Sequence, residues 1–246
     1  KAGFDPNHIA LDALRLKIDS LLFCSSAIKL NILAAAFHEK CGLTVANAIG
    51  PFNMDSMGIA LPDLRLKTPS SDILLAFKMD MNAFSTDLPA DSTGAFSVNM
   101  HGSLGNQDLL TLASPYIPRY VRRVWPRVPI VVDGKAGGNL HRLHVNGLHL
   151  AMPGIMKVNA DGFVANVTNL ASLRADMTVN ATASNLSFVT PLLPKSVTSN
   201  INIPRGIGLR GNVKLDGKRI ATKFSASQGG GSIGGTLRSE ERRVGK

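Results

Sequence analysis

The sequence is poor in aromatic residues and has no long apolar run. With one Trp, two Tyr and an aromatic content of 5%, it lacks the stacking platforms on which single-stranded nucleic acids are bound. No stretch of about 18 uncharged apolar residues is present, so these residues predict no membrane-spanning helix. The hydrophobic content of 44% is nevertheless ordinary for a folded protein, which argues against disorder. We therefore expect a folded chain whose apolar surface is mainly aliphatic.

Cysteine is also scarce, with Cys24 and Cys41 only. Cys24 lies in a turn-like segment before an expected strand, and Cys41 follows that strand. A strand of about 10 residues spans roughly 30 Å, which places the two thiols near opposite ends of one hairpin. That separation is too large for a disulfide. We predict that both cysteines are free, so they do not define the redox compartment.

Acidic residues are fewer than basic ones, and the formal net charge is +10. The last residues, 238–246, contribute +2 of this charge through four basic and two acidic side chains. This segment resembles the translation of a common sequencing adapter, so we expect a non-native tail and leave it out of the fold. The other cations stand singly along expected strands. This spread argues against nucleic acid as a partner and leaves contact with anionic lipid headgroups open.

Residues for catalysis or metal binding form no recognisable set. The closest histidines are His141, His144 and His149, but alternation along one strand puts His144 on the opposite face from the other two. His141 and His149 would be about 26 Å apart on an extended strand, whereas zinc ligands lie within about 2.3 Å of the metal. No Ser/His/Asp set or carboxylate pair stands out among the 17 acidic residues. We therefore expect neither an enzyme nor a metal or cofactor site.

The dominant feature that is present is a strict alternation of apolar and polar residues in short segments. Residues 14–19, Leu-Arg-Leu-Lys-Ile-Asp, and residues 73–81 are examples. A period of two places every apolar side chain of a strand on one face of a sheet. Repeated down the chain, the pattern predicts an all-β fold with one elongated antiparallel sheet and a continuous apolar face. The expected strands lie near 9–22, 27–37, 57–67, 72–83, 93–101, 141–151, 155–167, 172–181, 184–189, 207–215, 219–226 and 232–237.

Turn residues and two irregular segments divide the expected sheet. Asp161-Gly162 and Asp216-Gly217 predict hairpin turns. Short, proline-broken helical segments are expected near 107–125 and 188–197, each followed by a similar strand, which indicates a weak internal repeat of about 80 residues and an open, solenoid-like sheet. The predicted organisation is a first sheet segment, a helical and Pro-rich insert, a second sheet segment with a short helical insert, and the tail. Their bounds are 1–105, 106–127, 128–237 and 238–246.

Four pieces of the sequence resemble pieces of a known family. They are Phe4-Asp5-Pro6-Asn7-His8-Ile9, Phe37-His38-Glu39-Lys40-Cys41-Gly42-Leu43-Thr44-Val45, Leu61-Pro62-Asp63-Leu64-Arg65-Leu66-Lys67-Thr68-Pro69-Ser70-Ser71 and Ile203-Pro204-Arg205-Gly206-Ile207-Gly208-Leu209. In their order and spacing, through roughly residues 4–237, the chain resembles large AsmA-like/TamB proteins of the Bacteroidetes envelope. Cys41 stands where the matching turn more commonly has Ser.

The resemblance implies an internal fragment of a long periplasmic protein of a Gram-negative bacterium. An N-terminal helix outside this sequence would anchor that protein in the inner membrane. The resemblance also implies a sheet curled into a U-shaped, "β-taco"-like trough that is apolar inside. Such proteins are implicated in moving phospholipid between membranes and in outer-membrane assembly, and the family has no catalytic residues. An outer-membrane assembly protein is the implied partner, through regions outside this sequence.

Together, the alternation and the resemblance lead us to expect a section of a periplasm-spanning lipid conduit. An apolar groove would shield phospholipid acyl chains and so support outer-membrane lipid transport and biogenesis. The expected lining residues share the apolar parity of their strands: Leu14, Leu16, Ile18, Ile28, Leu30, Ile32, Ile73, Leu75, Phe77, Met79, Phe96, Val98 and Met100.

Two alternatives stay open at this point. Arg119, Arg122 and Arg123, with Arg127 nearby, are candidates for contact with an anionic headgroup, because helical spacing puts the first three on one side. The other interpretation of this cluster is a solvated helix face. For the whole chain, the alternative function is a structural or assembly scaffold for outer-membrane or secreted proteins, with no lipid cargo. An open apolar face favours the conduit, and a face filled by the protein's own side chains favours the scaffold.

Overall fold

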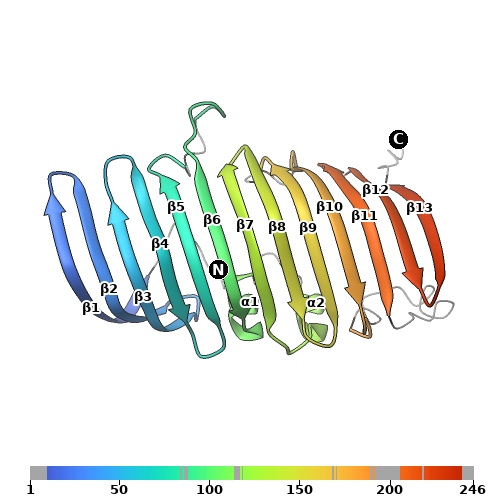
Figure 1. The fold of residues 1–246 in the computed structure, drawn as a ribbon, viewed down its shortest axis with the longest axis horizontal. Helices are drawn as coiled ribbons and strands as arrows, with labels where there is room; N and C mark the ends of the chain where they lie inside the picture. The colour runs from blue at the N-terminus through green and yellow to red at the C-terminus, as the bar shows by residue number, and fades with distance from the viewer. Residues whose placement is uncertain are drawn as a thin grey trace, which may run out of the picture.

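The computed structural model describes residues 10–83, 85, 88–113, 117, 119–167, 169, 171–188, 191, 206–217 and 219–239. Within these residues the chain forms one antiparallel sheet of 13 strands in sequence order, with two short helices between β6 and β7 (Figure 1). The strands are β1 (Leu11–Cys24), β2 (Ala27–Glu39), β3 (Thr44–Met54), β4 (Gly58–Lys67), β5 (Asp72–Asp80), β6 (Phe96–Leu104), β7 (Ile130–Asn139), β8 (Arg142–Met152), β9 (Met156–Ala165), β10 (Arg174–Ala183), β11 (Ile207–Asp216), β12 (Arg219–Gln228) and β13 (Gly231–Ser239). The helices are α1 (Asn106–Leu112) and α2 (Arg119–Val124). The all-β fold expected from the alternation is confirmed.

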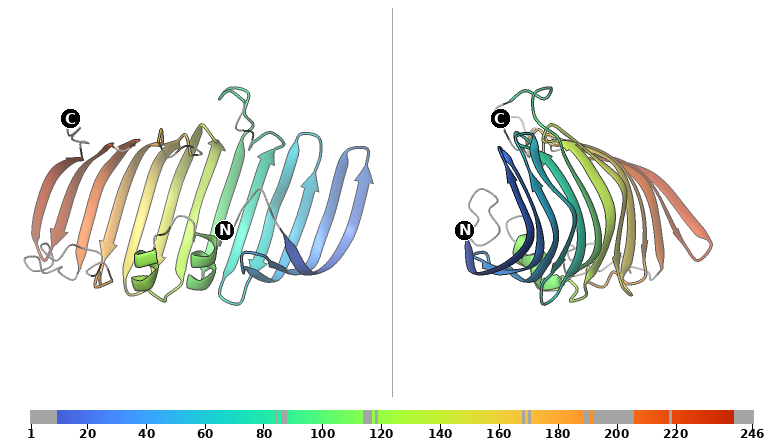
Figure 2. Two further views of the ribbon diagram at one scale, coloured as in Figure 1. Left: turned by 180° about the vertical axis from the view of Figure 1, so that it is seen from behind. Right: turned by 60° about the vertical axis from the view of Figure 1, so that its left-hand side comes forward.

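The sheet is elongated, open and curled. Each strand pairs only with its neighbours in the sequence, so β1 and β13 lie at opposite ends (Figure 1). Figure 2 shows the strands bent into a trough, with both helices on its concave side along one rim. We call this the helical rim, which also carries the β4–β5 connection, and we call the opposite rim, with the β5–β6 connection, the loop rim. Neither helix of the described chain is long and apolar enough to cross a bilayer.

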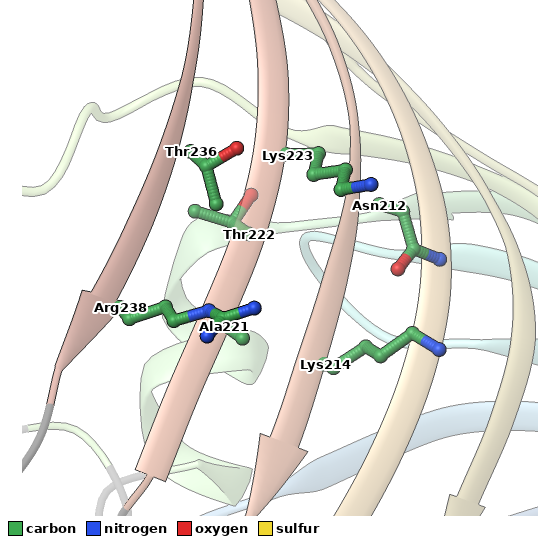
Figure 3. A pocket seen from close by; sticks show the side chains of 7 residues that line it. All are labelled: Asn212, Lys214, Ala221, Thr222, Lys223, Thr236 and Arg238. Carbon is green, nitrogen blue, oxygen red and sulfur yellow. The ribbon is translucent and has the colours of Figure 1, made fainter.

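The register assigns side chains to two faces, because directly opposed residues of antiparallel strands point to the same side. One apolar row crosses the sheet from β5 to β13: Phe77, Val98, Ala136, Val145, Gly162, Met177, Val213, Thr222 and Leu237. The neighbouring row is mainly polar and includes Lys78, Ser97, His144, Asp176 and Lys214. Figure 3 shows Lys214 and Asn212 on the side of the sheet away from the helix behind it. The polar rows therefore form the convex face and the apolar rows the concave face.

Four strands of the curled sheet contain a glycine at positive φ, and we expect these glycines to permit the bend of their strands. Gly50, Gly102, Gly138 and Gly162 lie inside β3, β6, β7 and β9, with φ of +149°, +148°, +140° and +150°. A Cβ at any of these positions would overlap a carbonyl oxygen of the adjacent strand. Glycine is the residue that fits such close approaches.

The two Asp-Gly pairs have different outcomes. Asp216-Gly217 ends β11 and begins a turn to β12, as predicted. Asp161-Gly162 lies inside β9, so the predicted hairpin turn there is wrong. The glycine serves a positive φ and a close approach to the Asp176 carbonyl, not a chain reversal.

The buried core is small and lies near one end of the sheet. Ala35, Val45, Ala48 and Leu64, from β2, β3 and β4, form a buried cluster. The chain exposes 16247 Å² of surface, whereas size scaling gives roughly 10,500 Å² for a compact monomer of 26.1 kDa. A single curled sheet explains the difference, because no second layer covers most of its faces.

Several element predictions need correction. The alternation does not predict β3 or β7, because Gly50 and Pro51 interrupt the first, and Gly134, Gly137 and Gly138 interrupt the second. A strand was expected near 184–189, but residues 184–188 form none.

Ser184 and Asn185 explain the missing strand, because their N–H groups donate to the Ile155 carbonyl at 2.8 and 3.2 Å in a turn. The helical segment expected near 107–125 is confirmed as α1 and α2. The segment expected near 188–197 lies outside the described residues apart from Phe188 and Pro191.

Candidate functional site

The expected lining residues fall on β1, β2, β5 and β6. Their register places them on the concave face, except for Leu14, which lies in an irregularity of β1 and has no paired residue. Four facing positions join β5 to β6: Ile73–Gly102, Leu75–Met100, Phe77–Val98 and Met79–Phe96. On the other side, Ile18 pairs with Ile32, and Ile28 pairs with Met54. Met54 faces Ile59, which faces Met79, so the two groups share one face. The regular register of β5 and β6 agrees with the parity assigned from the sequence, whereas β1 and β2 contain register shifts.

The concave face is open in some places and filled in others. Leu14 and Leu16 are 55% exposed and Ile18 is 37% exposed, because β1 is an edge strand. Val98 is half-buried. By contrast, Leu75 packs against the buried cluster of Ala35, Val45, Ala48 and Leu64, as do Ile32, Phe37, Leu43, Leu61 and Leu66. Ile130, Met152 and Ala160, from β7, β8 and β9, are also buried. The face is thus closed over β2–β4 and at these three positions, and is partly accessible elsewhere.

The same face continues over strands whose residues were not nominated from the sequence. Its members on β7–β11 include Val132, Leu143, Val145, Leu150, Val158, Val164, Met177, Val179, Val213 and Leu215. A hollow of about 380 Å³ near the ends of β11–β13 includes Ile207, Ala226 and Ile233, and Ile233 is 73% exposed. The alternation of apolar and polar residues in β10 indicates this extension of the apolar face. In β7 the glycines interrupt the alternation, so the sequence pattern does not indicate it there.

A buried carboxylate fixes α1 to the sheet. Asp108, 6% exposed in the first turn of α1, accepts hydrogen bonds from the hydroxyls of Thr68, Ser70 (2.7 Å) and Ser71 (2.5 Å) in the β4–β5 connection. Ser71 Oγ in turn accepts the Gly105 N–H at 2.9 Å. A carboxylate that accepts several hydrogen bonds is stable when buried. This latch holds α1 at the helical rim.

The arginine cluster lies at the same rim, on and after α2. Arg119, Arg123 and Arg127 are exposed and Arg122 is half-buried. Figure 2 places α2 on the concave side, so the helix that carries Arg119, Arg122 and Arg123 borders the apolar face. Trp125 packs edge-on against Phe188, with ring centroids 6.4 Å apart. The Trp125 indole N–H is shielded from solvent and has no acceptor within the described part of the chain.

The histidine parity predicted from the sequence is wrong. His141 lies in the turn before β8. A register shift between Val145 and Leu148 brings His144 and His149 to the same, convex face. His149 Nδ1 is 2.7 Å from Asn159 Oδ1, and His101 Nδ1 is 2.6 Å from the carboxylate of Asp133. Among the described residues, no group of three or more His, Cys, Asp or Glu is arranged to hold a metal ion.

Both cysteines are free, as predicted, and lie beyond opposite ends of β2. Cys24 is exposed, whereas Cys41 lies next to Glu39. The Cys41 thiol and its backbone N–H (2.5 Å) both donate to the Glu39 carboxylate, which lowers the pKa of Glu39. Burial raises the pKa of the Cys41 thiol, and the hydrogen bond to Glu39 raises it further.

A shallow basic pocket of about 390 Å³ lies on the convex face over β11–β13 (Figure 3). Lys214, Lys223 and Arg238 supply its positive charge. Asp176 offsets Lys214 at 3.0 Å, and hydrogen bonds from Asn212 and then Lys214 lower the pKa of Asp176. Arg238 belongs to the tail that the sequence predicts to be non-native, so this pocket is not a candidate site.

Comparisons with family models, curated proteins and solved structures find no match to this chain. The resemblance to AsmA-like/TamB proteins therefore stays a prediction. The candidate functional site is the concave apolar face with the helical rim that borders it.

Proposed function

We propose that the chain is a section of a lipid conduit in which the concave face shields phospholipid acyl chains. A single observation carries the proposal: the apolar rows continue from strand to strand across the sheet and stay partly accessible. In this proposal the chain acts in the periplasm and supports outer-membrane lipid transport and biogenesis. It performs no catalysis and needs no cofactor.

The chemistry of the face fits acyl chains. Apart from a few Phe residues and Thr222, the rows from β5 to β12 consist of aliphatic side chains, Met, Ala and Gly. Each methylene removed from water is stabilised by about 0.8 kcal/mol, without directional requirements. Met79 and Met100 add flexible, polarizable side chains that adapt to different ligands. Uniform aliphatic rows also allow a chain to slide along the trough at little free-energy cost.

The scaffold alternative has one local observation in its favour. The cluster of Ala35, Val45, Ala48 and Leu64 fills the concave face over β2–β4 with the protein's own side chains. A scaffold would be dry along its whole length, whereas the face outside this cluster keeps partly exposed apolar residues. We therefore favour the conduit and assign acyl-chain binding to the part from β5 onward.

Site-specific photo-crosslinking tests the proposal. A photoreactive amino acid replaces Val98, which is half-buried on the concave face, or its neighbour Asn99, which is exposed on the convex face as the matched control. The chain is expressed in the periplasm of a Gram-negative bacterium and irradiated. We expect phospholipid adducts from position 98 and none from position 99. Protein adducts without lipid at position 98 would support the scaffold instead. Position 75 is a second concave probe, next to the buried cluster.

A further inference from the structure

The helical rim concentrates positive charge that no acidic residue in the described part of the chain neutralises. Arg119, Arg122, Arg123 and Arg127 follow one another without any acidic residue from position 109 to position 127. None of the four forms an ion pair or hydrogen bond with another described residue. The nearest preceding carboxylate, Asp108, is already occupied by three hydroxyl groups. Within the described residues, the four guanidinium groups therefore have no protein partner that competes with a ligand.

The arginines of the helical rim lie next to one end of the concave apolar face. β6 ends at Leu104 and β7 begins at Ile130, and these two residues face each other at the helical rim. Ile130 is only 8% exposed, so the concave face reaches the rim beneath the inserted helices. The loop rim beside β5 and β6 instead carries Asp80 and Asp91. Asp80, however, has the convex parity of Lys78, and Asp72 at the helical end of β5 already pairs with Arg65 and Lys67. The asymmetry of the trough therefore rests on the arginines of the helical rim.

We propose that the helical rim binds the phosphate of a phospholipid whose acyl chains lie on the concave face, with preference for an anionic headgroup. The inference rests on the proposed function and adds which lipid is held and in which orientation. Guanidinium groups bind phosphate oxygens in bidentate geometry. Tyr120, 62% exposed, adds an amphipathic aromatic side chain of the kind enriched at membrane–water interfaces.

Dimensions support this orientation. The nine residues of β6 extend about 30 Å from rim to rim. The acyl chains of one lipid leaflet cover about 15 Å, half the hydrocarbon core of a bilayer. With its phosphate at the helical rim, a phospholipid would extend about halfway along the strands.

Binding of short-chain lipids to the chain tests the inference, with Trp125, the single tryptophan, as the fluorescent reporter. The probes are dioctanoyl-phosphatidylglycerol, dioctanoylglycerol, which has the same chains without phosphate, and inorganic phosphate. The test variant is Arg119→Gln/Arg123→Gln. The matched control, Lys78→Gln/Lys135→Gln, removes two exposed cations from the convex face. Arg119→Lys/Arg123→Lys keeps the charge without the bidentate geometry.

We expect the wild-type chain to bind phosphatidylglycerol more tightly than dioctanoylglycerol. The test variant should lose about five- to thirty-fold in affinity for phosphatidylglycerol and none for dioctanoylglycerol, and the lysine variant should lose less. The convex control should match the wild type. Inorganic phosphate alone should bind weakly, because it lacks the apolar part.

Other outcomes overturn the inference in distinguishable ways. Equal affinity for both lipids, unchanged in the test variant, would refute the headgroup site and leave the conduit intact. Binding of inorganic phosphate as tight as that of the lipid would refute a lipid-specific site. Sedimentation with phosphatidylglycerol vesicles without binding of the monomeric lipid would indicate a bilayer-surface contact instead. Binding of neither lipid would refute the conduit proposal as well.

Discussion

The bend of β7 provides the sharpest test of how the sequence sets the curvature of the sheet. Gly137 and Gly138 are adjacent in this strand, yet their environments differ. Gly138 has φ of +140°, and a Cβ there would overlap the Arg142 carbonyl oxygen of β8. Gly137 has no positive φ, and a Cβ there would have its nearest neighbour, the Phe96 carbonyl oxygen, at 3.6 Å. The same substitution, Gly→Ala, should therefore have opposite effects at the two positions.

The expected magnitudes follow from these two environments. Gly138→Ala forces an L-residue into a sparsely populated backbone region, which costs about 1–3 kcal/mol before any strand displacement. Gly137→Ala introduces no strain and restricts the unfolded chain, which stabilises by about 0.4–1 kcal/mol. The two variants should differ by about 1.5–4 kcal/mol in free energy of unfolding.

Urea and thermal unfolding, followed by far-UV circular dichroism and by Trp125 fluorescence, measure this difference. Trp125 precedes β7 by five residues and so reports on the affected region. We expect a lower midpoint than the wild type for Gly138→Ala and an equal or higher one for Gly137→Ala. Equal midpoints for the two variants would show that the bend of β7 does not depend on glycine at position 138, and the assignment of curvature to positive-φ glycines would be wrong.

Three further predictions concern the latch, the carboxylates and the cysteines. Asp108→Ala removes the common acceptor of Thr68, Ser70 and Ser71. The variant should lose about 1.5–3 kcal/mol in free energy of unfolding, and amide hydrogen exchange in α1 should become faster. Unchanged exchange would contradict the latch. Hydrogen bonds or charges lower the pKa of Glu39, Asp72 and Asp176. The contribution of these carboxylates to stability is therefore present above the unfolded pKa and is lost as the pH falls below about 4. Glu39→Gln should weaken this acid dependence in chemical unfolding curves measured from pH 7 to pH 3. Maleimide should modify exposed Cys24 faster than Cys41, because burial and Glu39 raise the pKa of the Cys41 thiol. After mild oxidation, mass spectrometry should detect no intramolecular disulfide.

The faces of regular strands could be predicted from the sequence, because their side chains follow a strict period of two. β5 and β6 show this directly: Phe77, Met79, Val98 and Met100 share the face that alternation assigns to them. No other information was needed for these strands. The same argument holds wherever the register of two paired strands contains no bulge.

Prediction failed where a bulge or glycine breaks the period. The shift between Val145 and Leu148 moves His149 to the face of His144, because one extra residue inverts the parity of all that follow. Neither the shift nor its place is visible in the pattern of apolar residues. The Asp161-Gly162 pair predicts a turn. The structure shows instead that glycine is needed there because the Asp176 carbonyl of the neighbouring strand lies too close for a Cβ.

The helical rim could be predicted only in part. The prolines and the arginine spacing indicated a short helical insert, but not its place on the concave side. Asp108 meets Thr68 across 40 positions of sequence, and no local pattern predicts such a contact. The buried cluster over β2–β4 was likewise invisible, because Ala35 and Ala48 are small residues that become core only when three strands curl together.

The strict sequence order of the 13 strands makes the length of the trough modular. Neighbouring strands are about 4.8 Å apart, so the whole sheet measures roughly 55–60 Å along its axis and each hairpin accounts for about 10 Å of it. Adding or deleting one complete hairpin preserves strand direction, and with it the identity of both rims and both faces. A single-strand insertion would instead exchange the rims for everything that follows. Adding strands in units of two therefore lengthens the trough while its cross-section stays the same.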